Sequence, residues 1–197
     1  MDLVVATRNA HKTREFAQLL SDDFKVVDLN SFPQIESVEE TGGTFAENAI
    51  LKASSASEKI VDLVLADDSG LEVDALNGAP GIFSARYAGE HATDEQNIVK
   101  LLRDLAQTNN RAARFRCVLA LARRGALLGT FDGVVEGMIV DVPRGSFGFG
   151  YDPIFVPNGF GQTFAELPTK NQISHRAKAT SALREALRAG NIKGVPN

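Results

Sequence analysis

Two adjacent aspartates, Asp67 and Asp68, directly follow the apolar run from Leu63 to Ala66. This run predicts a buried strand, and ligands of open α/β sheets gather beyond the carboxyl ends of strands. Neighbouring strand residues point to opposite faces, so we expect one of the two carboxylates to enter a site. It could bind Mg²⁺ or accept a proton from an attacking water. The alternative is a solvated acidic turn that includes Glu72 and Asp74.

A second acidic pair, Glu39 and Glu40, precedes a predicted helix from Thr44 to about Ile60. This helix opens with the capping pattern Thr-Phe-Ala-Glu. Mg²⁺ keeps several waters, so one or two carboxylates plus substrate phosphates are sufficient ligands, and either glutamate is a candidate. Asn48 and Lys52 are four residues apart, share one helix face, and could address the same ligand.

The first apolar run, Leu3 to Ala6, is followed by a polar segment that opens a helical pattern. The free N–H groups and the dipole at a helix N-terminus favour an anion such as a phosphate. A lysine in the first turn is disfavoured by the dipole unless an anion offsets both charges. The alternative is a solvated lysine behind an asparagine cap. The segment consists of Thr7, Arg8, Asn9, Ala10, His11 and Lys12.

A glycine-rich segment, Gly145 to Pro153, carries several aromatic residues. It lacks the Lys-Ser/Thr of a Walker loop and the third glycine of a dinucleotide fingerprint. Its glycines would let the backbone approach a flat ligand, and Phe149 or Tyr151 could stack on a base. A turn that only buries its aromatic residues is the alternative.

Three potential cations, Lys170, His175 and Arg176, lie at the start of the last predicted helix. Solvation at the surface is the default expectation for each. Together with Lys12 and Lys52, however, they could neutralise an anionic ligand in an acidic protein.

The remaining patterns predict an α/β protein with a mixed sheet. Strands are expected at 25–29 and, as a hairpin or meander, at 113–122 and 126–142, and helices at 94–105 and 174–187. The segment 190–197 is expected to fray.

The chain has 197 residues, 44% of them hydrophobic and 23% charged, as in ordinary globular proteins. A net charge of −4 argues against a general nucleic-acid or anionic-membrane surface. Cys117 lies in an apolar run and is expected to be a buried thiol. There is no long apolar run or basic leader, so we expect a cytoplasmic protein. The histidine spacing does not favour a zinc site.

Several blocks, taken in order, resemble the inosine triphosphate pyrophosphatase family, also called noncanonical purine nucleoside triphosphate (dITP/XTP) pyrophosphatases. The similarity is greatest to the bacterial branch and runs from residue 3 to about residue 188. The blocks are Thr7 to Lys12, Glu39 to Gly42 with Thr44 to Ala49, Ala66 to Leu76, Gly78 to Gly89, Phe149 to Pro153, and Ser174 to Ala179.

The resemblance implies one pyrophosphatase domain over residues 1–197. Its α/β fold would have an elongated mixed sheet flanked by helices, and two lobes with a central active-site cleft. It also implies a homodimer and an Mg²⁺ cofactor.

The resemblance assigns Asp68 as proton acceptor and metal ligand, with Glu39 favoured over Glu40 as the second ligand. The segment from Thr7 to Lys12 would hold the triphosphate, and Lys52 would assist. Arg8 departs from the small or polar residue of many relatives. Ser69, Phe149, Gly150, Tyr151, Asp152 and Lys170 would line the nucleotide site, and His175 and Arg176 would read the base.

In the implied reaction, water attacks the α-phosphorus of inosine, deoxyinosine or xanthosine triphosphate, and pyrophosphate leaves. Hydrolysis would remove these nucleotides before they enter DNA or RNA. Donors from Arg176 or the backbone would pair with the 6-oxo group and would be left unpaired by adenine. Two rival readings are a pyrophosphatase for pyrimidine or ordinary nucleotides and a module that binds nucleotides or RNA without catalysis.

Overall fold

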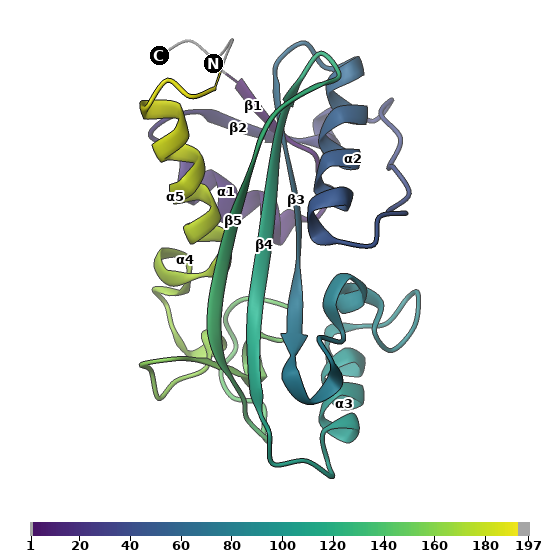
Figure 1. Ribbon diagram of the computed structural model, residues 1–197, viewed down its shortest axis with the longest axis vertical. Coiled ribbons are helices and arrows are strands. Elements are labelled where there is room, and N and C mark those ends of the chain that lie inside the picture. Colours follow the sequence, from purple (N-terminus) through teal and green to yellow (C-terminus); the bar gives the residue numbers. More distant parts are fainter. Residues whose placement is uncertain (1, 193–197) are drawn as a thin grey trace. The chain divides into compact units, whose positions relative to one another are not determined.

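The computed structural model describes residues 2–192, and the chain divides into two compact units (Figure 1). Unit 1 comprises Met1–Asp68, Cys117–Gly133 and Arg176–Asn197, and unit 2 comprises Ser69–Arg116 and Val134–His175. Residues 193–197, within the segment expected to fray, lie outside the described residues.

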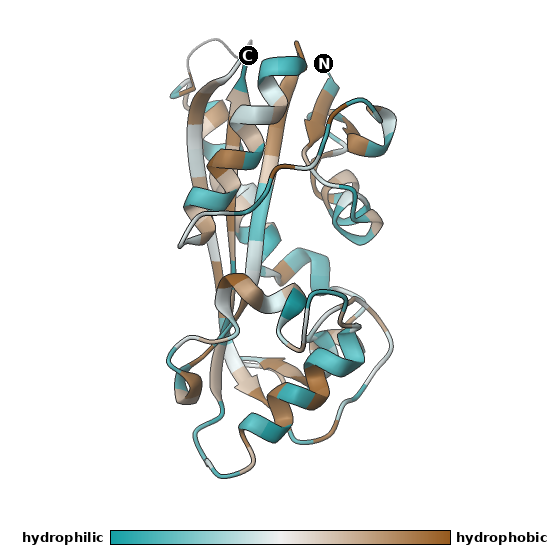
Figure 2. Ribbon diagram, turned by 90° about the vertical axis from the view of Figure 1, so that its right-hand side faces the viewer, coloured by the Kyte–Doolittle hydropathy of each residue, from teal (hydrophilic) through white to brown (hydrophobic). Residues whose placement is uncertain are grey.

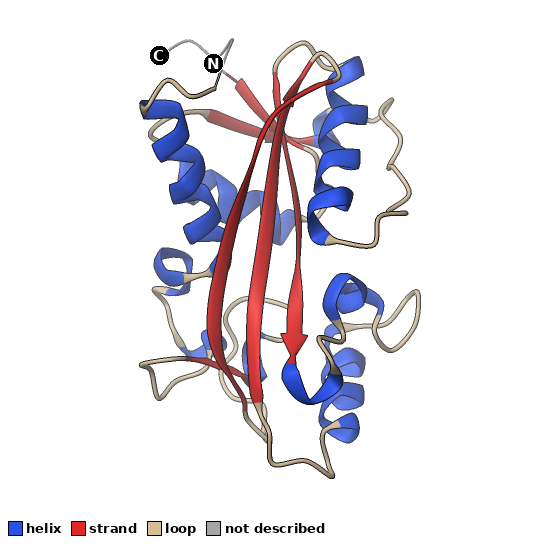
Figure 3. Cartoon of the chain, viewed as in Figure 1, coloured by secondary structure: helices blue, strands red, loops and turns tan. Residues whose placement is uncertain are grey.

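Six strands form one mixed sheet in the order β2-β1-β3-β4-β5-β6 (Figure 3). β1 pairs in parallel with β2 and β3, whereas β5 and β6 are antiparallel. The predicted mixture of strand directions is therefore confirmed. The strands are β1 (Asp2–Val5), β2 (Lys25–Asp28), β3 (Leu63–Val73), β4 (Ala112–Arg123), β5 (Ala126–Ile139) and β6 (Phe155–Pro157).

The α-helices are α1 (Ala10–Leu20), α2 (Phe45–Lys59), α3 (Asp94–Asp104), α4 (Lys170–Ile173) and α5 (His175–Arg188). The predicted start of α2 is confirmed, because the Thr44 hydroxyl accepts the Glu47 N–H at 3.1 Å. The second Thr-Phe-Ala-Glu sequence also forms a cap, at Thr163, but only a 3₁₀ turn follows it. Leu167 leaves the helical conformation at once, so this turn cannot propagate.

The predicted hairpin is formed by β4 and β5, which are joined by Arg124 and Gly125 alone. Both turn residues have positive φ, 52° and 78°. Two such residues give the twist that a tight hairpin of right-twisted strands requires.

Unit 1 has a core of strand residues covered by two helices. Phe16 and Leu20 of α1 and Leu183 of α5 pack with Leu3 and Leu65 of the strands. The hydropathy colouring in Figure 2 shows the apolar stretches along the strands of this unit. Cys117 belongs to the same core with no exposed surface, which confirms the predicted buried thiol.

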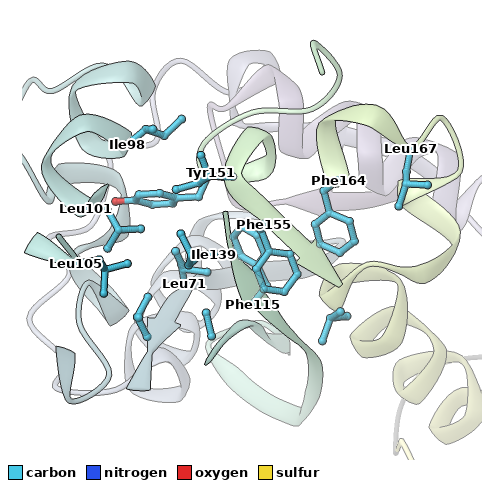
Figure 4. Close-up of a cluster of buried hydrophobic side chains, with 14 residues drawn as sticks. Leu71, Ile98, Leu101, Leu105, Phe115, Ile139, Tyr151, Phe155, Phe164 and Leu167 are labelled. Carbon is cyan, nitrogen blue, oxygen red and sulfur yellow. The ribbon is translucent and has the colours of Figure 1, made fainter. Parts of the chain in front are cut away.

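Unit 2 has a separate aromatic core (Figure 4). The ring centroid of Phe115 lies 4.8 Å from that of Phe155 and 5.8 Å from that of Phe164. Leu101 of α3 and Tyr151 of the glycine-rich segment belong to the same cluster. The core therefore fixes both α3 and this segment.

The third strand is longer than predicted. We expected it to end at Ala66, but β3 continues through Asp67 and Asp68 to Val73. Both aspartates are buried, 3% and 6% exposed, so the alternative of a solvated acidic turn is wrong. Charges can lie inside a strand only where cations compensate them. Among residues 2–192, no helix is long and apolar enough to cross a membrane.

Candidate functional site

The helix start predicted to bind phosphate is built as a capped, fixed loop. The Asn9 side chain accepts the N–H groups of His11 and Lys12 at 2.8 and 3.4 Å, which confirms the expected asparagine cap. The Arg8 guanidinium donates to the carbonyls of Leu29 and Ile35 at 2.8 and 2.6 Å. Arg8 thus ties the loop to the segment after β2.

The Lys12 side chain is not solvated, in contrast to the alternative considered for this segment. Its Nζ lies 2.5 Å from Asp67 Oδ1, and the side chain is only 17% exposed. The contact is an ion pair between an ammonium group and a buried carboxylate. Asp67 therefore supplies an anion that offsets the unfavourable position of Lys12 in the first turn of α1.

Asp67 also contacts the buried guanidinium of Arg176. Arg176 Nη2 and Nε lie 2.9 and 3.3 Å from Asp67 Oδ2, and Arg176 Nη1 donates to Glu15 of α1. Burial alone would raise the pKa of Asp67, but Lys12, Arg176 and Lys52 outweigh it and hold this pKa well below its usual range. Asp67 is thus an acid held in its charged form by two neighbouring cations.

Asp68 points to the opposite face of β3, as expected for a strand neighbour. Its Oδ1 accepts from Lys52 Nζ at 2.9 Å, and its Oδ2 accepts from Asn48 Nδ2 at 3.3 Å. The predicted common face of Asn48 and Lys52 is therefore confirmed. Burial raises the pKa of Asp68, with Glu40 adding to this effect and Lys52 opposing it.

Lys52 bridges Asp68 to a second carboxylate, that of Glu40. Lys52 Nζ lies 2.8 Å from Glu40 Oε1. Burial tends to lower the pKa of Lys52, but the charges of Asp68, Asp67 and Glu40 together raise it above its ordinary value. Glu39, by contrast, is exposed. The arrangement thus brings Glu40 to Asp68 through one ammonium group.

The acidic cluster of unit 1 suits a small hard cation. Its carboxylates, Glu15, Glu40, Asp67 and Asp68, outnumber its cations, Lys12, Lys52 and Arg176. No group of three or more His, Cys, Asp or Glu side chains that could hold a metal ion occurs among residues 2–192. Asp68 and Glu40 could supply two oxygen ligands, which is the number that Mg²⁺ commonly takes from a protein.

The glycine-rich segment of unit 2 is held from within by Asp152. This carboxylate is 1% exposed and accepts from the Phe149 N–H at 2.9 Å and from Lys170 Nζ at 2.6 Å. A Cβ at Gly148 would lie 2.0 Å from Asp152 Oδ2, so only glycine fits there. Lys170 Nζ also lies 4.9 Å from the ring centroid of Phe149.

The other predicted nucleotide-site residues of unit 2 differ in exposure. Tyr151 is 3% exposed and donates from its hydroxyl to the carbonyl of Ser84 at 2.9 Å, so it is a core residue. Phe149 is half-buried and is the better placed of the two aromatic residues to stack on a base. His175 is buried, with its ring stacked on Phe115 at 4.8 Å between centroids. Ser69, at the middle of β3, is half-buried.

Two contacts were not foreseen from the sequence. Asp94, at the start of α3, accepts the Gly150 N–H at 2.6 Å and so holds the glycine-rich segment from outside. Glu15 binds Arg176 inside unit 1. One signal was available for Glu15: it lies three residues after Lys12, and thus on the same helix face, directly before the core residue Phe16.

The predicted site residues therefore form two groups, each within one unit. The group in unit 1 contains Lys12, Lys52, Asp67, Asp68 and Arg176, with Glu15, Glu40 and Asn48. The group in unit 2 contains Phe149, Gly150, Asp152 and Lys170. The central cleft implied by the resemblance stays a prediction.

Known proteins are similar to this chain in sequence and fold over nearly its whole length. The dITP/XTP pyrophosphatase of Geobacillus kaustophilus is 51% identical over 189 residues, covering 93% of each chain. That of Bacillus subtilis is 46% identical, covering 95% of this chain and 98% of its own. The Ham1 protein structure from Staphylococcus aureus superposes with a TM-score of 0.86 at 44% identity, covering 96% of this chain and all of that one.

The sequence pattern of one protein family also matches the chain. The model of the Ham1 family matches residues 3–186, which include all the predicted site residues. The resemblance stated from the sequence is thus confirmed, and the chain belongs to the Ham1 family.

Proposed function

We propose that this protein hydrolyses noncanonical purine nucleoside triphosphates, dITP, ITP and XTP, to the monophosphate and pyrophosphate. The observation that carries the proposal is the Asp68 carboxylate, buried between Lys52 and Asn48. The curated relatives named dITP/XTP pyrophosphatase support the choice of substrate. Removing these nucleotides would keep them out of DNA and RNA.

Asp68 is the proposed proton acceptor for the attacking water. Its raised pKa makes it a stronger base than an ordinary carboxylate. Lys12 and Lys52 lie on either side of the acidic pair and stabilise charge on the phosphoryl oxygens. The positive end of the α1 dipole favours the phosphates, and Arg8 holds that loop through backbone carbonyls.

We assign the metal site to Asp68 and Glu40. The resemblance to the family favoured Glu39, but Glu40 shares the Lys52 ammonium with Asp68 and Glu39 is exposed. When bound there, a divalent cation, Mg²⁺ in this proposal, supplies positive charge to the phosphoryl oxygens. This charge is needed because the cluster itself has more carboxylates than cations.

In this proposal the ring of Phe149 stacks on the base, and backbone groups around Gly150 form hydrogen bonds with it. Asp152 and Lys170 shape this segment rather than touch the base, because both are buried in a mutual ion pair at 2.6 Å. Base reading by His175 and Arg176 stays a prediction. Ser69 adjoins Asp68 in the chain and is proposed to contact the substrate.

The test is pyrophosphate release from dITP, XTP, GTP and ATP at equal concentration, each with and without Mg²⁺. We expect fast, metal-dependent release from the first two alone. Equal rates on all four would keep the hydrolase and reject the selection of the base. No release from any of them would favour a binding module without catalysis.

Two further expectations belong to this proposal: a homodimer and a cytoplasmic location. Sedimentation equilibrium of the purified protein measures the first, with twice the chain mass of 21.2 kDa expected. Cell fractionation measures the second.

A further inference from the structure

We propose that Glu15 and Asp67 are positioning residues of the reaction. Asp67 holds the Lys12 ammonium directly, and Glu15 acts on it through Arg176 and Asp67. The inference rests on the proposed function, in which Lys12 meets the triphosphate. It adds two residues whose side chains are not expected to touch the substrate.

Asp67 divides its two carboxylate oxygens between two cations. Oδ2 accepts from Arg176 Nη2 at 2.9 Å and Nε at 3.3 Å, whereas Oδ1 faces Lys12 Nζ at 2.5 Å. On its other side, Arg176 donates to Glu15. The four side chains therefore form one chain of alternating charge.

This chain begins and ends on the same helix. Glu15 and Lys12 are both residues of α1, three positions apart, so Arg176 and Asp67 close a ring with the helix. Two carboxylates and two cations make the ring neutral, which permits its burial. A shift of any one member would therefore be passed to the others.

The four side chains of the ring differ in their exposure to solvent. The side chains of Asp67 and Arg176 are each 1% exposed and that of Glu15 is 9% exposed, whereas that of Lys12 is 17% exposed. Lys12 is the member nearest to solvent, and hence to a ligand. The three buried members fix the position of the one that can meet a phosphate.

A purely structural ion-pair network would predict a different result from a positioning role. If the ring only stabilises the fold, loss of Glu15 lowers the melting temperature and leaves the turnover of the folded enzyme unchanged. If it positions Lys12, turnover falls, since a displacement of about 1 Å can cost about 100-fold in rate.

The experiment compares Glu15→Gln, which keeps the shape of the side chain, with wild type under saturating Mg²⁺ and XTP. We expect kcat to fall about 10- to 100-fold. The matched control is Asp23→Asn, which breaks an ion pair of 2.5 Å with Arg184 of α5 at the far end of α1. This control should keep the wild-type kcat.

The decisive measurement repeats Glu15→Gln in a Lys12→Ala background. If Glu15 acts through Lys12, Glu15→Gln lowers kcat little further in the Lys12→Ala background, because the effects of residues that act as a unit are not additive. Equal fold-losses in both backgrounds, or a wild-type kcat for the folded Glu15→Gln protein, would overturn the proposal. Should Glu15→Gln not fold, Glu15→Asp keeps the charge but withdraws the carboxylate by one methylene, and the same cycle applies.

A second readout does not depend on hydrolysis. Inorganic tripolyphosphate is titrated calorimetrically into the metal-free proteins of the same cycle. Glu15→Gln should weaken its binding in the wild-type background and not in the Lys12→Ala background. Unchanged or tighter binding would overturn the positioning role. If wild type binds tripolyphosphate with this coupling but releases no pyrophosphate from any nucleotide, the proposed function fails and the positioning role stands.

Discussion

At the scale of single residues, β3 separates two carboxylates that are neighbours in the sequence. Asp67 lies among Lys12 and Arg176, which lower its pKa, whereas burial raises the pKa of Asp68. Pairs of acids whose environments push their pKa values apart mark the residues of acid–base chemistry. Asp67 is suited to hold cations, and Asp68 is suited to accept a proton.

The first prediction concerns this base. Asp68→Asn should fold and lose nearly all turnover, on the order of 100-fold or more, because the proton acceptor is gone. Pyrophosphate release and circular dichroism measure the two properties. A folded and active Asp68→Asn protein would refute the assigned role.

Glu40 and Glu39 form a matched pair for testing the metal site. Glu40→Gln should raise the Mg²⁺ concentration needed for half-maximal activity by about tenfold or more, the usual size of effect when a metal site loses an oxygen partner. Glu39→Gln, which removes an exposed carboxylate next to it, should leave that concentration nearly unchanged. The reverse order would restore Glu39 as the second ligand.

Lys52 should set the acidic limb of the pH–rate profile. Its charge opposes the effect of burial on Asp68, so Lys52→Gln should raise the pKa of Asp68 further. Asp68 must be ionised to act as a base, and the acidic limb of kcat/KM should therefore move to higher pH. Lys52→Arg keeps the charge and serves as the control. An unmoved limb in Lys52→Gln would mean that Asp68 is not the titrating base.

At the scale of elements, α3 supports the glycine-rich segment through one side chain. Asp94 and Glu95 both lie in the first turn of α3, so both interact favourably with its dipole. Only Asp94 is seen to accept the Gly150 N–H. Substituting Asp94 and Glu95 one at a time therefore distinguishes the loop contact from the interaction with the helix dipole.

We expect Asp94→Ala to raise KM for XTP several-fold, because loss of one hydrogen bond that orders the loop costs about 1 kcal/mol. Glu95→Ala removes an interaction with the helix dipole and no contact to the loop, so it should leave KM unchanged. Steady-state kinetics of the two variants make the comparison. Equal KM values would show that Gly150 needs no support from α3.

The elements were mostly predictable from the sequence, and the partners of their side chains were not. The capping residue Thr44 and the spacing of Asn48 and Lys52 act within one helix, so local patterns revealed them. Arg176 meets Glu15 across 161 positions, and no local pattern encodes such a contact. The length of β3 was misjudged for the same reason, because distant cations allow its aspartates to be buried.

At the scale of the whole molecule, the net charge of the chain is −4, but buried charges of opposite sign compensate one another locally. The stability of the fold at acidic pH should therefore depend on these buried charges. The pKa of Asp67 is lower in the folded protein than in the unfolded chain, so its ionised form stabilises the fold above the ordinary carboxyl pKa. That contribution is lost as the pH falls from there through the folded-state pKa.

Asp67→Asn should therefore destabilise the metal-free protein at pH 7 by about 3–5 kcal/mol, because it leaves Lys12 and Arg176 without a shared carboxylate. The difference from wild type should shrink as the pH falls below 3.8, the ordinary pKa of this group, since the unfolded wild-type chain then binds a proton at Asp67 that the folded protein does not. Urea unfolding at several pH values measures it. Asp23→Asn, which breaks a partly exposed pair, should cost about 0–1 kcal/mol. A difference for Asp67→Asn that stays constant from pH 7 to pH 3 would show that packing around this side chain, rather than its charge, stabilises unit 1.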